Sequence, residues 1–305
     1  MDRKIVRLGQ STLVVSLPLK WVRKQNLNPG DSVKVDETAD KLLISGEGKA
    51  EQRKTHLDAH DAGVLSRRML AAIYKAGYDI VEVEFKHPSE IKDIEAAVDL
   101  EAVSFEIVSM GKTSCTIRSI SEATEKEFQD LLHRTVFILQ TMSNDLLEAV
   151  KEDDLARIKE IKKLEKTNNK LTHFCRRSLN RSGYAQPEKT AVMYTIVEQL
   201  ENVADMYKFL CLDLEKYSSK KASKDVIEYF ELVNSAINDF CSLFFDYRLD
   251  KAKEFAVKRK NIITKGFSIF EKKNSVKDIV VTHHLLGITN SVFDILGPLI
   301  ALRLD

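Results

Sequence analysis

Residues 196–211, IVEQLENVADMYKFLC, carry the pattern that decides the fold of this chain. Apolar residues recur here at three- and four-residue spacing, which is the spacing of one face of an α-helix. Glu201 and Asp205 lie one turn apart beside that face. Carboxylates at the edge of a helical core cost free energy unless a cation meets them, so the pattern predicts either a Lys or Arg from a neighbouring helix or a metal ion. The apolar positions are Met193, Ile196, Val197, Leu200, Val203, Ala204, Tyr207, Leu210, Cys211 and Leu214.

The residues that break helices are scarce in the region around this stretch. Between residues 122 and 265 the chain has one glycine, Gly183, and one proline, Pro187, and both fall in one loop. A region so poor in breakers is predicted to be mostly helix. We expect six helices, at about 123–151, 154–181, 189–217, 224–247, 250–273 and 276–303. Helices as long as these favour a long antiparallel bundle.

The six expected helices fall into two related groups of three, which indicates an internal duplication. In this alignment Glu201 and Asp205 correspond to Leu286 and Asn290 of the last helix. Glu165 of the second helix corresponds to Arg259 of the fifth. Only the first half keeps the acids, which favours a special role for that half.

Composition limits the possible classes of protein. The 305 residues include 47 basic and 46 acidic ones, so net charge argues neither for nor against nucleic acid. There is no run of eighteen apolar residues and no signal-peptide pattern at the amino terminus, so we expect a cytoplasmic protein without stable membrane insertion. The cysteines are widely spaced and lie among apolar neighbours, which predicts reduced thiols in the core. They are Cys115, Cys175, Cys211 and Cys241.

Residues 1–46 are predicted to form a small β-rich domain. Two short strands meet at a turn around Gly9, a short helix follows Pro18, and a second strand pair ends the domain. So small a unit has too few large apolar residues for a stable core, so we expect it to dimerise. Residues 3–24 hold six basic and no acidic residues. Two copies would form a basic face wide enough for a DNA groove, and the alternative is a solvated charge run. The candidate DNA-binding residues are Arg3, Lys4, Arg7, Lys20, Arg23 and Lys24.

Residues 11–33, STLVVSLPLKWVRKQNLNPGDSV, resemble the swapped-hairpin DNA-binding domain of the AbrB/MazE type. The resemblance implies a dimer formed by exchange of hairpins. It also implies that Arg3, Lys4 and Arg7, on the first strand and its approach, contact DNA. Some relatives use this fold only to dimerise, so a scaffold without DNA binding stays open.

Residues 47–55 are expected to be a polar linker, and residues 56–121 a small α/β region. The pattern predicts a helix at Leu65–Lys75, a strand at Ile80–Phe85, a second helix after His87, and a hairpin of two further strands. His87 is interpreted as an ordinary surface histidine. We expect this region to act as a spacer or to support a dimer.

Residues 122–305 resemble the PhoU family of phosphate-uptake regulators, which are built from two three-helix repeats. The E-x-x-x-D motif of that family matches Glu201 and Asp205, and its other copy matches Glu165 with Asn169 in place of the second acid. In relatives these acids hold iron, zinc or similar ions. The resemblance therefore implies a site for one divalent ion, Fe, Zn or Mg, at Glu165, Asn169, Glu201 and Asp205, since such ions accept oxygen ligands and water.

The order of the two domains resembles archaeal phosphate-uptake regulators. It implies a mainly α protein, a PhoU-like bundle preceded by the β-rich domain and the α/β insert. The implied function is a homodimeric, DNA-binding, negative regulator that acts on promoters of phosphate genes. The alternative is a dimeric adaptor that docks on the ATPase subunit of the phosphate ABC transporter. An enzyme is not expected, because the sequence has no glycine-rich phosphate loop and because His283 and His284 are adjacent and point about 100° apart on a helix.

Overall fold

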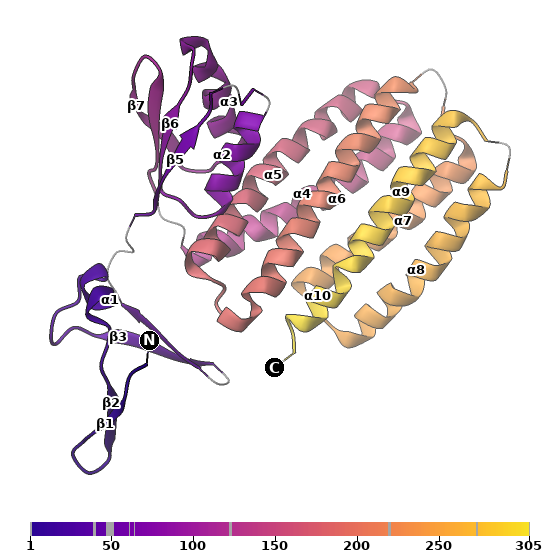
Figure 1. Cartoon of the computed structure of the whole chain (residues 1–305). Coiled ribbons are helices and arrows are strands. Elements are labelled where there is room, and N and C mark those ends of the chain that lie inside the picture. Colours follow the sequence, from indigo (N-terminus) through magenta and orange to yellow (C-terminus); the bar gives the residue numbers. More distant parts are fainter. Residues whose placement is uncertain are drawn as a thin grey trace. The chain divides into compact units, whose positions relative to one another are not determined.

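In the computed structural model, the chain divides into two compact units, Met1–Arg53 and Lys54–Asp305 (Figure 1). Most of the expected linker, residues 47–51, lies outside the described residues. The described residues are 2–38, 41–46, 52–60, 62–63, 65–121, 124–218, 221–272 and 274–304.

The amino-terminal unit contains the two strand pairs and the short helix expected from the sequence. Strands β1 (Ile5–Leu8) and β2 (Thr12–Val15) are antiparallel. Helix α1 (Leu19–Lys24) follows Pro18, and strands β3 (Val33–Thr38) and β4 (Lys41–Gly46) form a second antiparallel pair. The ribbon of β1 and β2 turns tightly because Gly9 takes a left-handed backbone conformation (φ 73°) that other residues rarely adopt.

The second unit begins with a four-stranded sheet in the order β5-β6-β8-β7. Its buried residues lie on one face, as the alternating burial of β6 and β8 indicates, and they pack against α2 and α3. β5 runs parallel to β6, and the other two pairs are antiparallel. The elements are β5 (Lys54–Asp58), α2 (Leu65–Lys75), β6 (Ile80–Glu84), α3 (Ile91–Glu101), β7 (Phe105–Met110) and β8 (Ser114–Ser119).

Strand β5 was not expected. It starts at Lys54, inside the range assigned to the linker. Its sequence, KTHLD, contains one large apolar residue, Leu57, so periodicity gave too weak a signal. The strand is held by parallel pairing with β6, a contact distant in sequence that no local pattern reveals.

The expected six long helices are confirmed, and with them the mainly α fold class. The last helix is divided at Ile295, between α9 and α10. Pro298 accounts for this break, because it has no N–H to donate to the carbonyl of Asp294. The helices are α4 (Glu125–Glu152), α5 (Leu155–Ser182), α6 (Thr190–Lys216), α7 (Lys224–Phe245), α8 (Leu249–Phe270), α9 (Val276–Asp294) and α10 (Leu296–Ala301).

The long helices form two halves with the same internal pairing. In each half all three helices contact one another: α4, α5 and α6 in the first, α7, α8 and α9 in the second. Across the halves, equivalent helices meet, α4 against α7 and α6 against α9. This arrangement agrees with the internal duplication predicted from the sequence.

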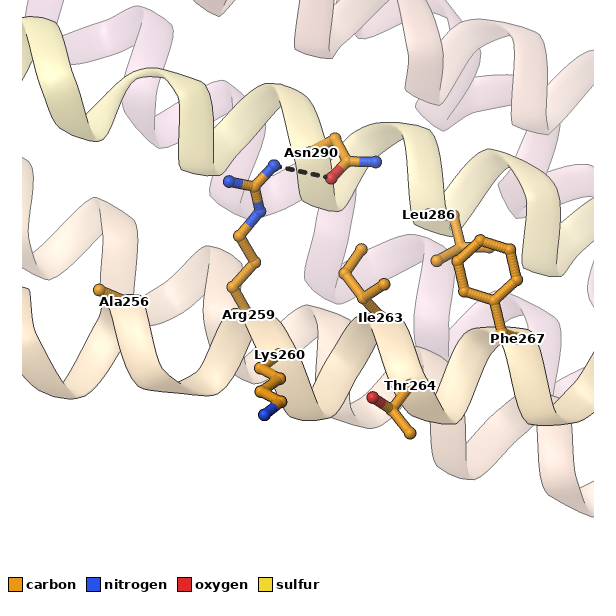
Figure 2. Close-up of a pocket in the computed structure, with 8 residues that line it drawn as sticks. All are labelled: Ala256, Arg259, Lys260, Ile263, Thr264, Phe267, Leu286 and Asn290. Carbon is orange, nitrogen blue, oxygen red and sulfur yellow. Dashed lines mark hydrogen bonds between the residues drawn. The ribbon is translucent and has the colours of Figure 1, made fainter.

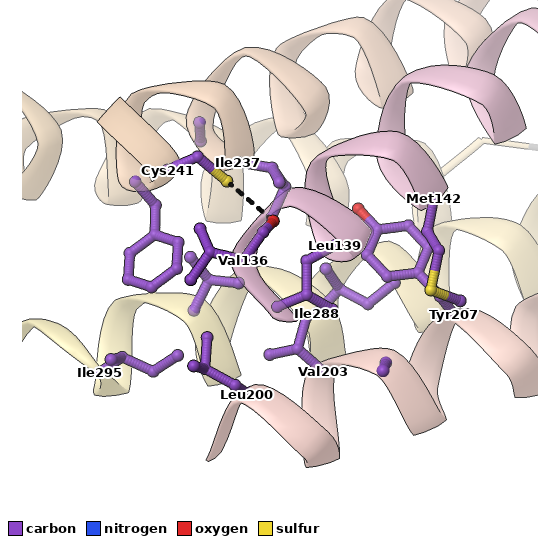
Figure 3. Packing of buried hydrophobic residues seen from close by; sticks show 14 of the residues in the cluster. Val136, Leu139, Met142, Leu200, Val203, Tyr207, Ile237, Cys241, Ile288 and Ile295 are labelled. Atoms are coloured by element: carbon purple, nitrogen blue, oxygen red, sulfur yellow. Dashed lines mark hydrogen bonds between the residues drawn. The ribbon is translucent and has the colours of Figure 1, made fainter. Parts of the chain in front are cut away.

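Helix α6, which contains residues 196–211, lies in the middle of the core of the helical bundle. Its apolar residues Leu200, Val203 and Tyr207 are fully buried against α4 and α9, represented by Leu139 and Ile288 (Figure 3). All ten apolar positions named in the sequence for this helix are buried. Among the described residues, one segment, Val276–Ala301, is long and apolar enough to cross a membrane, but half of its apolar window is buried in the bundle.

Candidate functional site

The acids of α5 and α6 line a polar cavity beneath helix α2. The cavity has a volume of about 550 Å³ and includes Glu165, Glu201 and Asp205. Arg67 and Lys75 of α2 also line it. The α/β region and the bundle therefore share one charged interface over the first half of the bundle.

Lys208 occupies the space between two of the predicted metal ligands. Its ammonium lies 2.9 Å from Glu165 Oε1 and also donates to Asp205 Oδ1. Asn169 donates its side-chain N–H to the same oxygen of Glu165 at 2.6 Å. Burial raises the pKa of Glu165, and Lys208 offsets part of that rise. Burial alone lowers the pKa of Lys208, but its hydrogen bonds to Asp205 and Glu165 outweigh this and raise it.

Glu201 has partners from α5. Arg176 and the hydroxyl of Thr172 both donate to its Oε2. His173 Nε2 lies 3.5 Å from the same oxygen. Burial alone raises the pKa of Glu201, but the hydrogen bond from His173 and the charge of Arg176 lower it to about 2. Glu201 is therefore ionised throughout the physiological range.

His173 connects the bundle to the α/β region. Its Nδ1 lies 3.1 Å from Glu101 Oε2, at the end of α3, and Glu101 also accepts from Arg67. Both Glu101 and His173 are buried. Burial alone lowers the pKa of His173, but hydrogen bonds to Glu101 and then Glu201 raise it. The imidazole is thus held between two carboxylates of different helices.

A second ionic contact fixes the same interface further along α5. Arg177 Nη2 donates to Asp79 Oδ1 at 2.7 Å, and Arg181 lies 2.9 Å from the other oxygen of Asp79. The guanidinium of Arg177 also lies over the rings of Tyr74 and Phe105, 5.1 Å from each centroid. These contacts pack the α/β region against the bundle, and its expected role as a spacer or as support for a dimer stays a prediction.

The sequence predicted that a Lys, an Arg or a metal ion would meet the acids, and Arg176 of α5 meets Glu201, but the sequence analysis did not identify the partner residues. The signal was present in α5, where Thr172, His173 and Arg176 follow Glu165 by seven, eight and eleven residues and so share its helix face. Lys208 follows Asp205 by three. Glu101 lies far away in sequence, so only the fold brings it to His173.

The four predicted metal ligands are close together, but they do not form a ready ion site. Lys208 bridges Glu165 and Asp205, while Glu201 faces Arg176 and His173. Within the part of the chain that the structure describes, no group of three or more His, Cys, Asp or Glu side chains could hold a metal ion. A divalent ion at Glu165, Asn169, Glu201 and Asp205 would have to displace Lys208, and it stays a prediction.

The six candidate DNA-binding residues are exposed in the amino-terminal unit. Arg3 and Lys4 precede β1, and Arg3 donates to Ser16 Oγ at 3.5 Å, just beyond β2. Arg7 lies within β1, opposite Leu13 of β2. The others belong to α1: Lys20 in its first turn, Arg23 and Lys24 in its last. DNA binding by these residues stays a prediction.

The remaining candidates have structural positions. His87 is exposed, and His284 Nε2 lies 2.8 Å from Asp213 Oδ2, which joins α9 to α6. All four cysteines are buried free thiols, as expected. Burial raises the pKa of Cys115 to about 11 and that of Cys175 to about 12, so these thiols are poor nucleophiles.

No protein-family model matches the chain, and no curated protein sequence matches it. Among solved structures, it is similar to the crystal structure of the phosphate transport system regulatory protein PhoU from Streptococcus pneumoniae. The similarity has a TM-score of 0.48 at 14% sequence identity, and it covers 59% of this chain and 94% of that chain.

Proposed function

We propose that this chain is a cytoplasmic, homodimeric regulator of phosphate uptake that binds DNA through its amino-terminal unit and is not an enzyme. One observation carries the DNA-binding part of the proposal. The unit presents a ribbon that is apolar on both faces, next to six exposed basic residues.

The exposure of β1 and β2 supports a dimer. One face of the ribbon carries Ile5 and Leu13, which are 69% and 63% exposed, and the other carries Val6 and Leu8, 57% and 65% exposed. No side chain described in residues 2–46 is buried. An isolated two-stranded ribbon is marginally stable in water, so these residues need a covering surface. A second copy of the chain supplies such a surface and doubles the number of exposed basic residues.

The link to phosphate uptake rests on the bundle sequence. The E-x-x-x-D spacing at Glu201 and Asp205 and the partial copy at Glu165 resemble those of phosphate-uptake regulators. The two three-helix halves of the bundle agree with that resemblance. The order of the two domains, which resembles that of archaeal phosphate-uptake regulators, supports promoters of phosphate-transport genes as the DNA targets and repression as the mode of regulation.

The test is binding of full-length protein to fluorescent promoter duplexes at two salt concentrations. Affinity should fall steeply with salt, because Lys and Arg side chains release counterions from the phosphates that they neutralise. The variant R3A/K4A/R7A should bind much more weakly, with a salt slope reduced by about one for each phosphate that it no longer neutralises.

The matched control is K159A/K163A/K166A, which removes three exposed positive charges from α5 and should keep wild-type affinity. If the wild-type dimer binds no duplex at low salt, DNA binding is wrong. The adaptor that docks on the ATPase subunit of the phosphate ABC transporter would then be the better assignment. Chromatin precipitation from phosphate-rich and phosphate-poor cultures would identify the promoters that are occupied.

A further inference from the structure

The second half of the bundle has an open groove between α8 and α9 (Figure 2). Its volume is about 480 Å³. Ile263, Phe267 and Leu286 supply an apolar floor and wall. Arg259 of α8 and Asn290 of α9 face each other and are joined by a hydrogen bond of 3.1 Å from the guanidinium to the amide oxygen (Figure 2). Lys260 also lines the groove.

This groove is the counterpart of the covered cavity in the first half. In the alignment of the halves, Arg259 stands where Glu165 does, and Leu286 and Asn290 stand where Glu201 and Asp205 do. The structure agrees, because Arg259 and Asn290 are in contact, as are the helices that carry Glu165 and Asp205. The duplication has therefore produced two grooves at equivalent places.

The cavity of the first half is covered by a helix of the same chain, and the groove of the second half has no such cover among the described residues. In the first half, α2 lies against α5 and contributes Arg67 and Lys75 to the lining of the cavity. Arg67 donates to Glu101 of α3, and Lys75 interacts electrostatically with Glu201 of α6. A helix with charge opposite to its groove is therefore the occupant that the chain itself supplies. In the second half, the positions equivalent to the acids of the first half hold one basic residue and two uncharged residues, and Lys260 adds a second positive charge.

The surface around the second groove has the properties of an unoccupied helix site. Phe267, which lines the groove, is 57% exposed. Helix α8 carries six basic and two acidic residues. Lys251 and Lys258 pair with Asp246 and Asp239. Arg259 Nη2 lies 3.9 Å from Asp294 Oδ1, and Lys260 is among the residues that line the groove. Apolar residues flanked by positive charge suit a helix with apolar anchors on one side and carboxylates beside them.

We propose that the α8–α9 groove binds an acidic amphipathic helix of a partner protein. The apolar side chains of that helix pack on Ile263, Phe267 and Leu286. Its carboxylates accept hydrogen bonds from Arg259 and Lys260, and the planar guanidinium of Arg259 suits a carboxylate in two-point contact. Nucleic acid fits less well, since the apolar floor of the groove offers nothing to a phosphate backbone.

The experiment measures fluorescence anisotropy of a labelled helical peptide of about sixteen residues, long enough for about four turns. Leucines at positions i, i+4 and i+7 supply the anchors, and glutamates flank them. A second peptide carries lysine at each glutamate position. The full-length chain should bind the acidic peptide, and R259Q and F267S should each weaken binding about tenfold, as expected for removal of a charge-assisted hydrogen bond or a buried anchor.

The matched control is K265Q, which removes one positive charge from the side of α8 that faces Asp225 of α7. It should leave affinity unchanged. The variant R259E/K260E should reverse the preference and bind the lysine peptide, a result that a misfolded protein would not give.

Three outcomes would overturn the proposal. They are equal binding of both peptides by the wild type, equal effects of R259Q and K265Q, and competition for the groove by duplex DNA or phosphatidylglycerol vesicles that R259Q alone abolishes. The last result would assign the surface to a polyanion rather than to a protein helix. Because residues 1–46 play no part in this assay, its failure is independent of the proposed DNA binding.

Discussion

At the scale of single residues, the acids of α5 and α6 are met by cations of the chain itself. The sequence left two possibilities for Glu201 and Asp205, a cation from a neighbouring helix or a metal ion. In the structure, Glu201 faces Arg176 of α5, and Asp205 faces Lys208 of its own helix. A carboxylate at the edge of a core costs free energy unless a positive charge pairs with it, and Arg176 and Lys208 pair with these two.

Lys208 contacts both Glu165 and Asp205, so we expect its removal to open this position to an ion. We expect K208A to lose about 1–2 kcal/mol of stability, because Glu165 and Asp205 then lie together uncompensated, a cost reduced by their partial exposure to solvent. Adding Mn²⁺ or Zn²⁺ after EDTA dialysis should raise the melting temperature of K208A more than that of the wild type. Elemental analysis should find roughly one divalent ion per K208A chain, and fewer after the additional change E201A.

The control for this prediction is K162A, which removes a lysine paired with Glu215 further along the same two helices. It should show no ion-dependent stabilisation beyond that of the wild type. Identical melting curves of K208A with and without ions would exclude these carboxylates as a metal site.

The raised pKa of His173 predicts how the free energy of unfolding depends on pH. Its raised folded-state pKa means that the imidazolium stabilises the fold below the unfolded value of about 6.5, and this contribution is lost as pH rises through the folded value. The lowered pKa of Glu201 acts in the other direction, since its contribution is present above the ordinary value of 4.5 and is lost as pH falls towards 2.

Denaturant unfolding in EDTA between pH 5 and pH 9 should therefore show a decrease in stability on the alkaline side that H173Q lacks. The exposed His87 provides the control, and H87Q should follow the wild-type curve. Parallel curves for H173Q and the wild type would show that folding does not change the pKa of His173.

At the scale of helices and strands, local signals predicted most elements well. α2 matches its expected range, and the long helices end close to where glycine, proline and acidic turns stand in the sequence. Asp154 illustrates the reason, because it caps α5 by accepting from the N–H of Arg157 at 2.9 Å. Strand β5 was missed because its stability comes from pairing with β6. The packing of α2 over the acids of α5 and α6 was missed for the same reason. Contacts between segments that are distant in sequence produce no repeating pattern of apolar residues.

Gly266 sets how closely α8 approaches its neighbours. A Cβ at this position would lie 2.7 Å from Tyr229 Oη and 2.8 Å from Leu286 Cδ2. We expect G266A to destabilise the protein by about 1–3 kcal/mol, the usual cost of overpacking a core. Thermal or urea unfolding measures this.

The matched control is G287A on α9, where the nearest atom to an added Cβ is Met206 Sδ at 3.8 Å. This change should stabilise the helix by roughly 0.5–1 kcal/mol, because alanine loses less backbone entropy than glycine. If G266A is as stable as G287A, α8 does not pack as tightly as the structure indicates.

At the scale of the whole molecule, the two halves of the bundle keep the same helix pairing but have diverged on their surfaces. The first half uses its groove internally, with α2 of the α/β region lying over the acids. The second half leaves its basic groove accessible, between Arg259 and Phe267. One duplicated framework thus supports an internal interface in one half and a surface for partners in the other.

Self-association should depend on the amino-terminal ribbon. Leu13 is exposed in one chain, so L13D would cost a monomer little. In a dimer that covers the ribbon, the same change buries an unpaired carboxylate, so we expect the dissociation constant to rise at least about a hundredfold. Sedimentation equilibrium of the full-length protein measures this constant, and DNA affinity should fall as the dimer weakens.

V257D introduces the same charge at an exposed apolar residue of α8 and should leave the dimer intact. A chain lacking residues 1–46 that remains a dimer of unchanged strength would move the interface to the helical unit, and the paired basic face proposed for DNA would lose its physical basis.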